Sequence, residues 1–314
     1  NVMVMGHMNG DIDSIGSSLG IYRLAKTFEK EAYIVNNTYG LTLANFIVTL
    51  KQEGYKDVIL DKTEAMNKIT PNTLLVIVDT HKRSYVEVPE LLEKTEKIVI
   101  IDHHRKSEDF IENAILTFHE AYASSASELV TEIVEYATQE VTLEQIEAES
   151  LYAGIMMDTK NFTFKTGVRT FEAAAYLRKY GIDIIKVKKW FQSDLESYTV
   201  IAEIVKNAEI INDSIGISVY EEKDKNANLI CAKAADELLT ISNISASFVL
   251  GRMGDKVCIS GRSIGDINVQ VILEKLGGGG HITLAGAQVE GMTLEEAKTE
   301  LIIRINEYFA ENNF

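Results

Sequence analysis

Four short segments in the first half of the chain carry carboxylates and imidazoles at spacings that suit metal binding. Their acidic and histidine side chains are His7, Asp11, Asp13, Asp79, His81, Asp102, His103, His104 and Asp158. Imidazole and carboxylate ligands without thiolates favour Mn²⁺ or a similar divalent ion over a thiolate-bound zinc. Four carboxylates and two histidines can hold two ions about 3.5–4 Å apart, the separation used for in-line phosphoryl displacement.

Each segment, taken alone, also allows a structural interpretation. Asp13 or Ser14 could cap the helix that follows, and Asp79 could cap a turn at the end of its strand. The position of His81 fits either a place beside the site or a place on the surface. His119 is expected to be structural or exposed. A carboxylate directly after the apolar run Leu74–Val78, as at Asp79, is costly to bury without a cation. The combination of the four segments therefore favours a metal site.

The elements that must position these residues follow from the apolar pattern. Expected strands are Val2–Met5, Ala32–Val35, Leu74–Val78 and Lys97–Ile101, and expected helices are Asp13–Phe28, Ser124–Gln139 and Leu143–Met157. Strands that alternate with helices predict an α/β domain with a doubly wound, mostly parallel sheet. The histidine and aspartate clusters come just after three of the strands. In open α/β sheets ligands bind beyond the carboxyl ends of the strands, so the clusters should converge there.

The second half predicts a second, smaller α/β domain with a mixed sheet. Expected strands are Ile215–Tyr220, Ser247–Met253 and Lys256–Ser260, and expected helices are Ala227–Leu239, Asn268–Lys275 and Thr293–Phe309. A helical stretch from Ile184 to Val205 joins the halves. We therefore expect a metal-binding catalytic domain at residues 1–186, a helical linker at 187–206 and a substrate-binding domain at 207–314.

Two features of the second half could bind a phosphate or a base. Gly277–Gly280 are four consecutive glycines followed by His281, and their backbone N–H groups can approach a ligand closely. Arg262 lies at the end of a predicted strand and could clamp a phosphate through two hydrogen bonds. The alternatives are a flexible loop for the glycines and a solvated surface position for Arg262.

The composition limits the class of ligand. The chain has 314 residues and a formal net charge of -16, which argues against a long nucleic acid because such ligands require basic surfaces. An acidic protein can still bind a small phosphate ligand when metal ions supply positive charge locally. The 2 cysteines, Cys231 and Cys258, are too few for a disulfide framework and fit a reducing, cytosolic setting. The sequence has no run of 18 or more apolar residues that would predict a membrane span.

The order of the motifs resembles a known family. G-H-x-x-x-D-x-D-S, V-D-T-H, D-H-H, a later M-D and G-G-G-G-H together resemble the DHH phosphoesterases with their DHH-associated C-terminal domain, over essentially the whole chain. Gly10 is one departure, since many members have proline before the first motif aspartate. Within the family the chain looks most like the catalytic region of the GdpP-type membrane-anchored phosphodiesterases that degrade cyclic di-AMP. Because the chain begins inside its first predicted strand, we expect a soluble fragment of such a protein, which would act at the cytoplasmic face of the cell membrane without membrane contact of its own.

The resemblance implies a role for each candidate residue. Two manganese ions are expected, the first held by His7, Asp11 and Asp79, and the second by Asp13, Asp79, His103 and Asp158. Asp102 would orient His103 without binding an ion itself, and His104 would face the substrate phosphate. In the other domain the nucleotide-binding residues would be Arg262, Gly278, Gly279, Gly280 and His281.

The implied activity is hydrolysis of cyclic di-AMP to linear 5′-pApA. A water bridging the two ions would attack phosphorus in line, with Asp79, His104 and Arg262 as the catalytic residues. One alternative is a nanoRNase or 3′-phosphoadenosine 5′-phosphate phosphatase on the same scaffold. An alternative of another class is a sensor that binds the cyclic dinucleotide without cleaving it. The expected partner is a small cyclic or short linear nucleotide, and we expect a homodimer.

Overall fold

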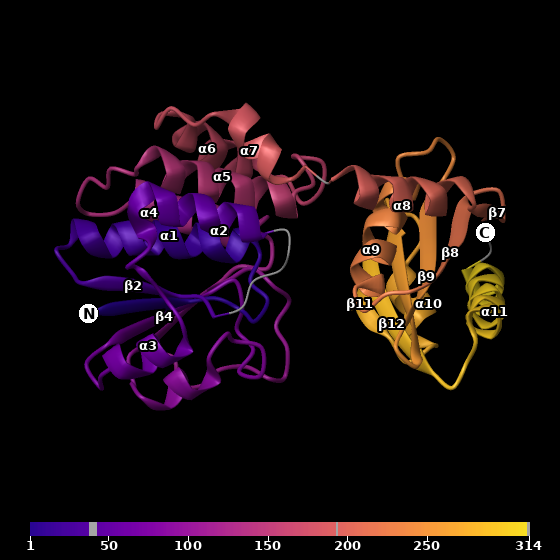
Figure 1. Cartoon of the computed structure of the whole chain (residues 1–314), viewed down its shortest axis with the longest axis horizontal. Helices are drawn as coiled ribbons and strands as arrows, with labels where there is room; N and C mark the ends of the chain where they lie inside the picture. Colours follow the sequence, from indigo (N-terminus) through magenta and orange to yellow (C-terminus); the bar gives the residue numbers. More distant parts are fainter. Residues whose placement is uncertain (38–42, 193, 313–314) are drawn as a thin grey trace. The chain divides into compact units, whose positions relative to one another are not determined.

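The computed structural model of the protein describes residues 1–37, 43–192 and 194–312. Contacts within the chain divide it into two compact units, Asn1–Gln192 and Ser193–Phe314. Both units are α/β structures (Figure 1). None of the helices within the described ranges has the length and hydrophobicity needed to cross a membrane.

The first unit is built on a six-stranded parallel sheet. Its strands are β1 (Val2–Met5), β2 (Ala32–Val35), β3 (Ile59–Leu60), β4 (Leu74–Val78), β5 (Ile98–Asp102) and β6 (Leu116–His119). They are arranged in the order β3-β2-β1-β4-β5-β6, and each strand pair is parallel. The chain therefore changes direction across the sheet between β1 and β4, which confirms the predicted doubly wound sheet. Ligands of such sheets bind beyond the strand ends at this switch point.

Helices cover both faces of this sheet. They are α1 (Ile12–Thr27), α2 (Ala44–Leu50), the π-helix η2 (Lys51–Tyr55), α3 (Lys62–Lys68), the 3₁₀ helix η3 (Pro89–Glu93), α4 (Ala126–Glu135), α5 (Gln145–Asp158), α6 (Val168–Arg178) and α7 (Ile184–Trp190). Figure 1 shows α1, α4 and α5 over one face, with α6 and α7 beyond them, and α3 on the opposite face. Alternate residues of β1 serve the two faces: Val2 and Val4 belong to the core with α1 and α5, whereas Met3 and Met5 pack in the core on the α3 side.

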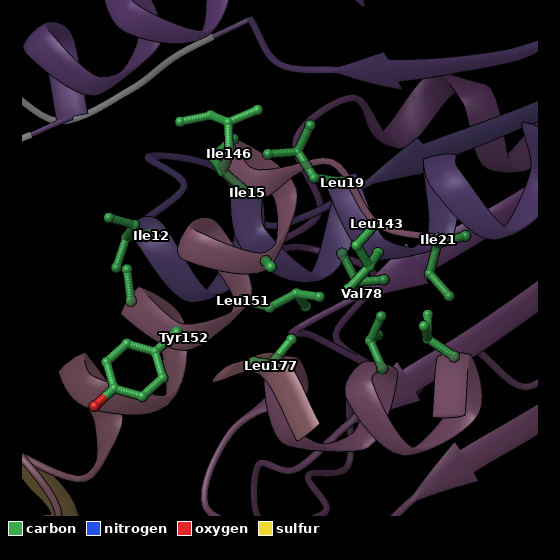
Figure 2. Packing of buried hydrophobic residues seen from close by; sticks show 14 of the residues in the cluster. Ile12, Ile15, Leu19, Ile21, Val78, Leu143, Ile146, Leu151, Tyr152 and Leu177 are labelled. Carbon is green, nitrogen blue, oxygen red and sulfur yellow. The ribbon is translucent and has the colours of Figure 1, made fainter. Parts of the chain in front are cut away.

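The contact between α1 and α5 is unusually close. Figure 2 shows Ile15 and Leu19 of α1 beside Ile146 and Leu151 of α5 in one apolar cluster. A Cβ atom at Gly16 would lie 2.5 Å from the carbonyl oxygen of Ser150, so only glycine permits this approach. Because α1 follows β1 and α5 ends at Asp158, this packing fixes two ligand-bearing segments relative to each other.

The second unit contains the predicted mixed sheet. Its elements are α8 (Leu195–Lys206), β7 (Glu209–Ile211), β8 (Ile215–Lys223), α9 (Ala227–Leu238), β9 (Ala246–Met253), β10 (Lys256–Ser263), α10 (Val269–Glu274), β11 (Gly279–His281), β12 (Leu284–Glu290) and α11 (Leu294–Asn312). The strand order is β11-β12-β10-β9-β8-β7, in which β8 and β9 are parallel and the other pairs antiparallel. Helices α8 and α9 pack on one face, and α10 and α11 pack on the other.

Two segments differ from the sequence-based expectation. The helical stretch expected from Ile184 to Val205 consists of two helices, because α7 ends at Trp190 and Asp194 caps the start of α8. Val187 of α7 belongs to the core of the first unit, whereas α8 packs in the second unit through Ile204. The glycine run is also not simply a loop, since Gly279–His281 forms edge strand β11.

Candidate functional site

The loop after β1 places two ligand candidates at the start of α1. Asp11 caps this helix, because its Oδ1 accepts hydrogen bonds from the backbone N–H of Asp13 (3.0 Å) and Ser14 (3.1 Å). His7 donates its Nδ1–H to the carbonyl oxygen of Met8, 2.9 Å away. Its Nε2 therefore faces the site, 3.9 Å from Asp11 Oδ1 and 3.4 Å from an oxygen of Asp79. The helix cap and the site thus share the Asp11 carboxylate.

Asp13 does not cap its own helix. It is fully buried, and its two carboxylate oxygens accept hydrogen bonds from the backbone N–H groups of Ala126 and Ser127, each 2.8 Å away. These amides belong to the first turn of α4, where unpaired N–H groups and the helix dipole favour an anion. Oδ2 of Asp13 also lies 3.8 Å from Nε2 of His103. Asp13 therefore connects α4 to the site, a link that sequence spacing cannot show.

Asp79 lies between the two histidines. It follows β4 directly, has a left-handed backbone with φ of 59°, and donates its N–H to the carbonyl of Ile101 on β5. One carboxylate oxygen is 3.4 Å from Nε2 of His7, and the other is 3.4 Å from Nε2 of His103. His103 Nε2 is also 3.1 Å from Oδ2 of Asp158, the last residue of α5. The expected ligands thus converge on Asp79.

These residues form two neighbouring groups suited to metal ions, which approach each other where Nε2 of His103 lies 3.4 Å from Oδ1 of Asp79. His7, Asp11 and Asp79 make one group, and Asp13, His103 and Asp158 make another, with the ligand atoms of each group within 4.8 Å of one another. Among the described residues, Oδ1 of Asp79 and both ring nitrogens of His103 are buried without a hydrogen-bond partner. Buried polar atoms are costly to leave without partners. Divalent ions with carboxylate and imidazole ligands would satisfy Oδ1 of Asp79 and Nε2 of His103, which both face the site, so the residues fit the expected metal.

The pKa values of the site reflect its concentrated negative charge. Burial lowers the pKa of His7, but hydrogen bonds and charge interactions with Asp11 and Asp79 outweigh it and raise the pKa to about 12. His103 shifts in the same direction because Asp158 and Asp79 outweigh its burial. Burial raises the pKa of Asp79, but the close approach of the His103 and His7 rings, each 3.4 Å away, lowers it to about 2. Protons on the histidines thus supply the positive charge that cations would supply when bound.

This balance predicts that metal affinity rises with pH. Because the raised pKa of His7 keeps its ring protonated at neutral pH in the ion-free chain, a divalent ion must displace that proton to bind. We expect the Mn²⁺ association constant to rise by about tenfold per pH unit for each proton released. Calorimetric titration at three pH values, in buffers of different ionisation enthalpy, measures the Mn²⁺ association constant and the number of protons released. Binding without proton release at neutral pH would contradict this picture.

Asp102 contacts three histidines, but not in the way expected. Its Oδ1 accepts from the backbone N–H of His103 (2.9 Å) and from Nδ1–H of His104 (2.8 Å), and its Oδ2 accepts from Nδ1–H of His81. It therefore orients the rings of His104 and His81, and it touches His103 only through the backbone. His119, expected to be structural or exposed, donates its Nε2–H to the carbonyl of His104.

The candidates in the second unit are held by their own neighbours. Arg262 is buried, which excludes a solvated surface position. Its Nε donates to Asp236 Oδ1 at 3.0 Å and its Nη1 donates to the carbonyl of Gly261 at 2.9 Å. The glycine strand β11 and His281 are exposed. Beside this strand lies a cavity of about 410 Å³, whose lining includes Ser260, Gln288 and the first three residues of the glycine run.

Sequence reasoning missed several residues that shape the site. Tyr85 stacks its ring on His7 with a centroid distance of 5.2 Å and an interplanar angle of 6°. The backbone amides of Ala126 and Ser127 hold Asp13, and Asp236 holds Arg262. Backbone donors carry no signal in residue type. Tyr85 follows the Asp79-Thr80-His81 motif closely, and this proximity is the one signal that could have indicated it.

Comparison with known proteins supports the architecture. The model of the DHH family, N-terminal domain, matches residues 1–155, and the DHHA1 domain model matches residues 212–311. A cyclic-di-AMP phosphodiesterase GdpP from Geobacillus thermodenitrificans is 42% identical over 312 residues, covering 98% of the chain and 47% of that relative. The chain thus spans about half the length of this relative. A bifunctional oligoribonuclease and PAP phosphatase NrnA from Thermus thermophilus is 28% identical over 311 residues, covering 98% of the chain and 89% of that relative.

A solved structure has the same fold. An exopolyphosphatase-related protein from Bacteroides fragilis superposes with a TM-score of 0.82 at 20% identity, covering 98% of this chain and 92% of that one. This likeness concerns the fold alone. Together with the matched domains and the 42% identity to a curated relative, it places both α/β units in one known architecture. With a DHH domain at residues 1–155 and a DHHA1 domain at residues 212–311, the chain belongs to the DHH family.

Proposed function

We propose that the chain hydrolyses cyclic di-AMP to linear 5′-pApA with two divalent, manganese-type ions. The observation that carries this proposal is the pair of ligand groups that meet at Asp79. The choice of substrate is supported by the 42% identity to a cyclic-di-AMP phosphodiesterase, against 28% to the NrnA relative. The net charge of -16 agrees with a small substrate, since a long nucleic acid would meet a repulsive surface.

The proposed ligands divide between the two ions. His7, Asp11 and Asp79 would hold the first, and the second would be held by Asp13, Asp79, His103 and Asp158. When bound, the ions would lower the pKa of a water and offset charge on the phosphoryl oxygens. The chain prepares this chemistry by fixing carboxylates at the start of α1, at the end of β4 and at the end of α5, so that little reorganisation is needed at the moment of reaction.

His104 is proposed to contact the phosphate that is cleaved. Asp102 holds its Nδ1–H, which leaves Nε2 on the opposite edge of the ring, and the side chain is 53% exposed. Desolvation lowers the pKa of His104, but the hydrogen bond to Asp102 outweighs it and raises the pKa overall. A protonated ring can donate Nε2–H to a phosphoryl oxygen.

The reaction consumes one water for each bond cleaved. The water oxygen attacks phosphorus in line, the bond from phosphorus to O3′ breaks, and O3′ takes a proton. The products are a 5′-phosphate and a 3′-hydroxyl on one linear molecule.

In the second unit, Arg262 and the segment Gly278–His281 are proposed to bind the nucleotide. Asp236 accepts a hydrogen bond from Nε of Arg262 and so orients its guanidinium. The cavity of about 410 Å³, lined in part by Gly278 and Gly279, falls within the usual range for small-molecule sites.

A substrate panel tests this proposal. With Mn²⁺ present, we expect kcat/KM for cyclic di-AMP to exceed that for 3′-phosphoadenosine 5′-phosphate by about tenfold or more, because contacts to the second nucleotide are lost in the smaller molecule. Parallel reactions with pApA and with chelator complete the panel. Turnover of the linear molecules alone would assign the NrnA-type activity instead. Binding of cyclic di-AMP without hydrolysis would indicate a sensor.

A further inference from the structure

His81 occupies a position behind the site that the proposed function does not explain. It is completely buried, two residues after Asp79, and its ring lies between Asp102 and Ser107. We propose that His81 is a positioning residue for the reaction, which acts through Asp102 to aim His104 at the substrate phosphate. The proposal rests on the proposed function, because His104 has a task only where a phosphodiester is cleaved.

The hydrogen bonds define which nitrogen of His81 carries the proton. Ser107 donates its backbone N–H to Nε2 of His81 over 3.0 Å, and the Ser107 hydroxyl lies 3.1 Å from the same nitrogen. Nε2 therefore acts as an acceptor, and the proton of the neutral ring is on Nδ1. That proton is donated to Oδ2 of Asp102. Because both nitrogens are in use within the protein, His81 is suited to orienting Asp102 rather than to binding a ligand.

Asp102 transmits this constraint to His104. The carboxylate is fully buried, and its Oδ1 accepts from Nδ1–H of His104 at 2.8 Å and from the backbone N–H of His103 and His104 at 2.9 and 3.2 Å. These bonds all involve Oδ1, so the rotation of the carboxylate about the Cβ–Cγ bond of Asp102 is fixed by a partner of Oδ2. That partner is His81, which donates its Nδ1–H to Oδ2. Loss of that donor would let the carboxylate turn, and the half-exposed His104 ring would turn with it.

A second contact fixes the backbone of His104. His119 at the end of β6 donates its Nε2–H to the carbonyl of His104 over 2.5 Å, and its ring meets the ring of His81 edge to face at 5.2 Å. The ring of His104 is thus the mobile part of a residue whose main chain is held. A small change in the orientation of such a group lowers the reaction rate strongly, because the transition state requires a narrow geometry.

The experiment compares two amide substitutions at the same position. In His81→Asn the side-chain N–H₂ can occupy the place of Nδ1–H and still donate to Asp102. In His81→Gln the amide reaches toward the place of Nε2, and the donor to Asp102 is lost. We expect His81→Gln to lower kcat by about 10–100-fold with KM within about threefold, the usual range for residues that support a reactive group. His81→Asn should recover most of that loss.

Further measurements separate positioning from a structural role. Calorimetry should give the same Mn²⁺ affinity for both variants, and thermal unfolding should give the same melting temperature, since both replacement side chains are polar and similar in size. Equal kcat values for the two variants, full activity of His81→Gln, or a loss explained by weaker Mn²⁺ binding would overturn the positioning role. Bis(p-nitrophenyl) phosphate, a generic phosphodiester, is assayed alongside cyclic di-AMP. If the unmodified chain hydrolyses the generic diester but not cyclic di-AMP, the proposed substrate is wrong, and the generic diester still decides the role of His81. If the unmodified chain hydrolyses neither compound, both the proposed function and the role of His81 are overturned.

Discussion

Replacing Asp79 with asparagine is expected to lower kcat for cyclic di-AMP by about a thousandfold or more. The two oxygens of Asp79 face different histidines, each 3.4 Å away, so one substitution removes charge from both ligand groups. Loss of metal-based charge stabilisation costs several kcal/mol, and about 1.4 kcal/mol corresponds to tenfold in rate. Asparagine is the suitable replacement because it tolerates the left-handed backbone found here, φ 59°. Steady-state kinetics and the number of Mn²⁺ ions bound measure the effect.

The matched control is Asp57→Asn, which removes the same charge from an exposed position of the same unit. Its kcat and its Mn²⁺ stoichiometry should stay within about twofold of the unmodified chain, as is usual for surface substitutions. If Asp79→Asn bound two Mn²⁺ ions normally and kept its turnover, the assignment of the metal centre would be wrong.

A second large effect is expected at Gly154, which has no side chain and no chemical role. A Cβ atom there would lie 2.2 Å from Oγ of Ser127, 2.6 Å from Oδ1 of Asp13 and 2.9 Å from Cα of Asp13. The serine hydroxyl could rotate away, but the Asp13 backbone in α1 cannot. We therefore expect Gly154→Ser to destabilise the chain by about 1–3 kcal/mol or more. Because the clash displaces Asp13, Mn²⁺ affinity and turnover should fall as well.

Gly167→Ser provides the matched comparison. It makes the same substitution at the N-cap of α6, where a Cβ would have nothing within 4 Å, and serine is a favourable residue at that position. Thermal unfolding and calorimetric Mn²⁺ titration of both variants separate the effects. Equal melting temperatures for the two would show that the α1–α5 contact is looser than the structure indicates.

The sequence predicts those strands and helices whose burial produces a local pattern of apolar residues. Strands β1, β4 and β5 are continuous apolar runs because both of their faces are covered. The edge strands β3 (Ile59–Leu60) and β6 (Leu116–His119) escaped prediction, since they are short and β6 is largely exposed. Strand β11 escaped for another reason: glycines have no strand preference, and only pairing with β12 makes Gly279–His281 extended.

The same distinction applies to the site. The convergence of the clusters after β1, β4 and β5 follows from parallel strands ending at one edge, and the structure brings all six expected ligands together. The partners that hold them could not be predicted, because they come from distant segments. Asp13 is held by amides of residues 126 and 127, and His81 pairs with Asp102 across two strands. Such pairs depend on tertiary packing, which single-sequence patterns do not contain.

The order of the site residues along the chain has a consequence for biosynthesis. The ligands extend from residue 7 to residue 158, and the last of them, Asp158, is also the last residue of α5. During translation the acidic and histidine side chains of the first three segments therefore leave the ribosome well before the site can close. The parallel pairs β1–β4 and β4–β5 are non-local contacts of the kind that form slowly. A nascent chain that stops short of α5 has most of the ligands but no complete centre, so the set of metal ligands is completed only when α5 has been synthesised.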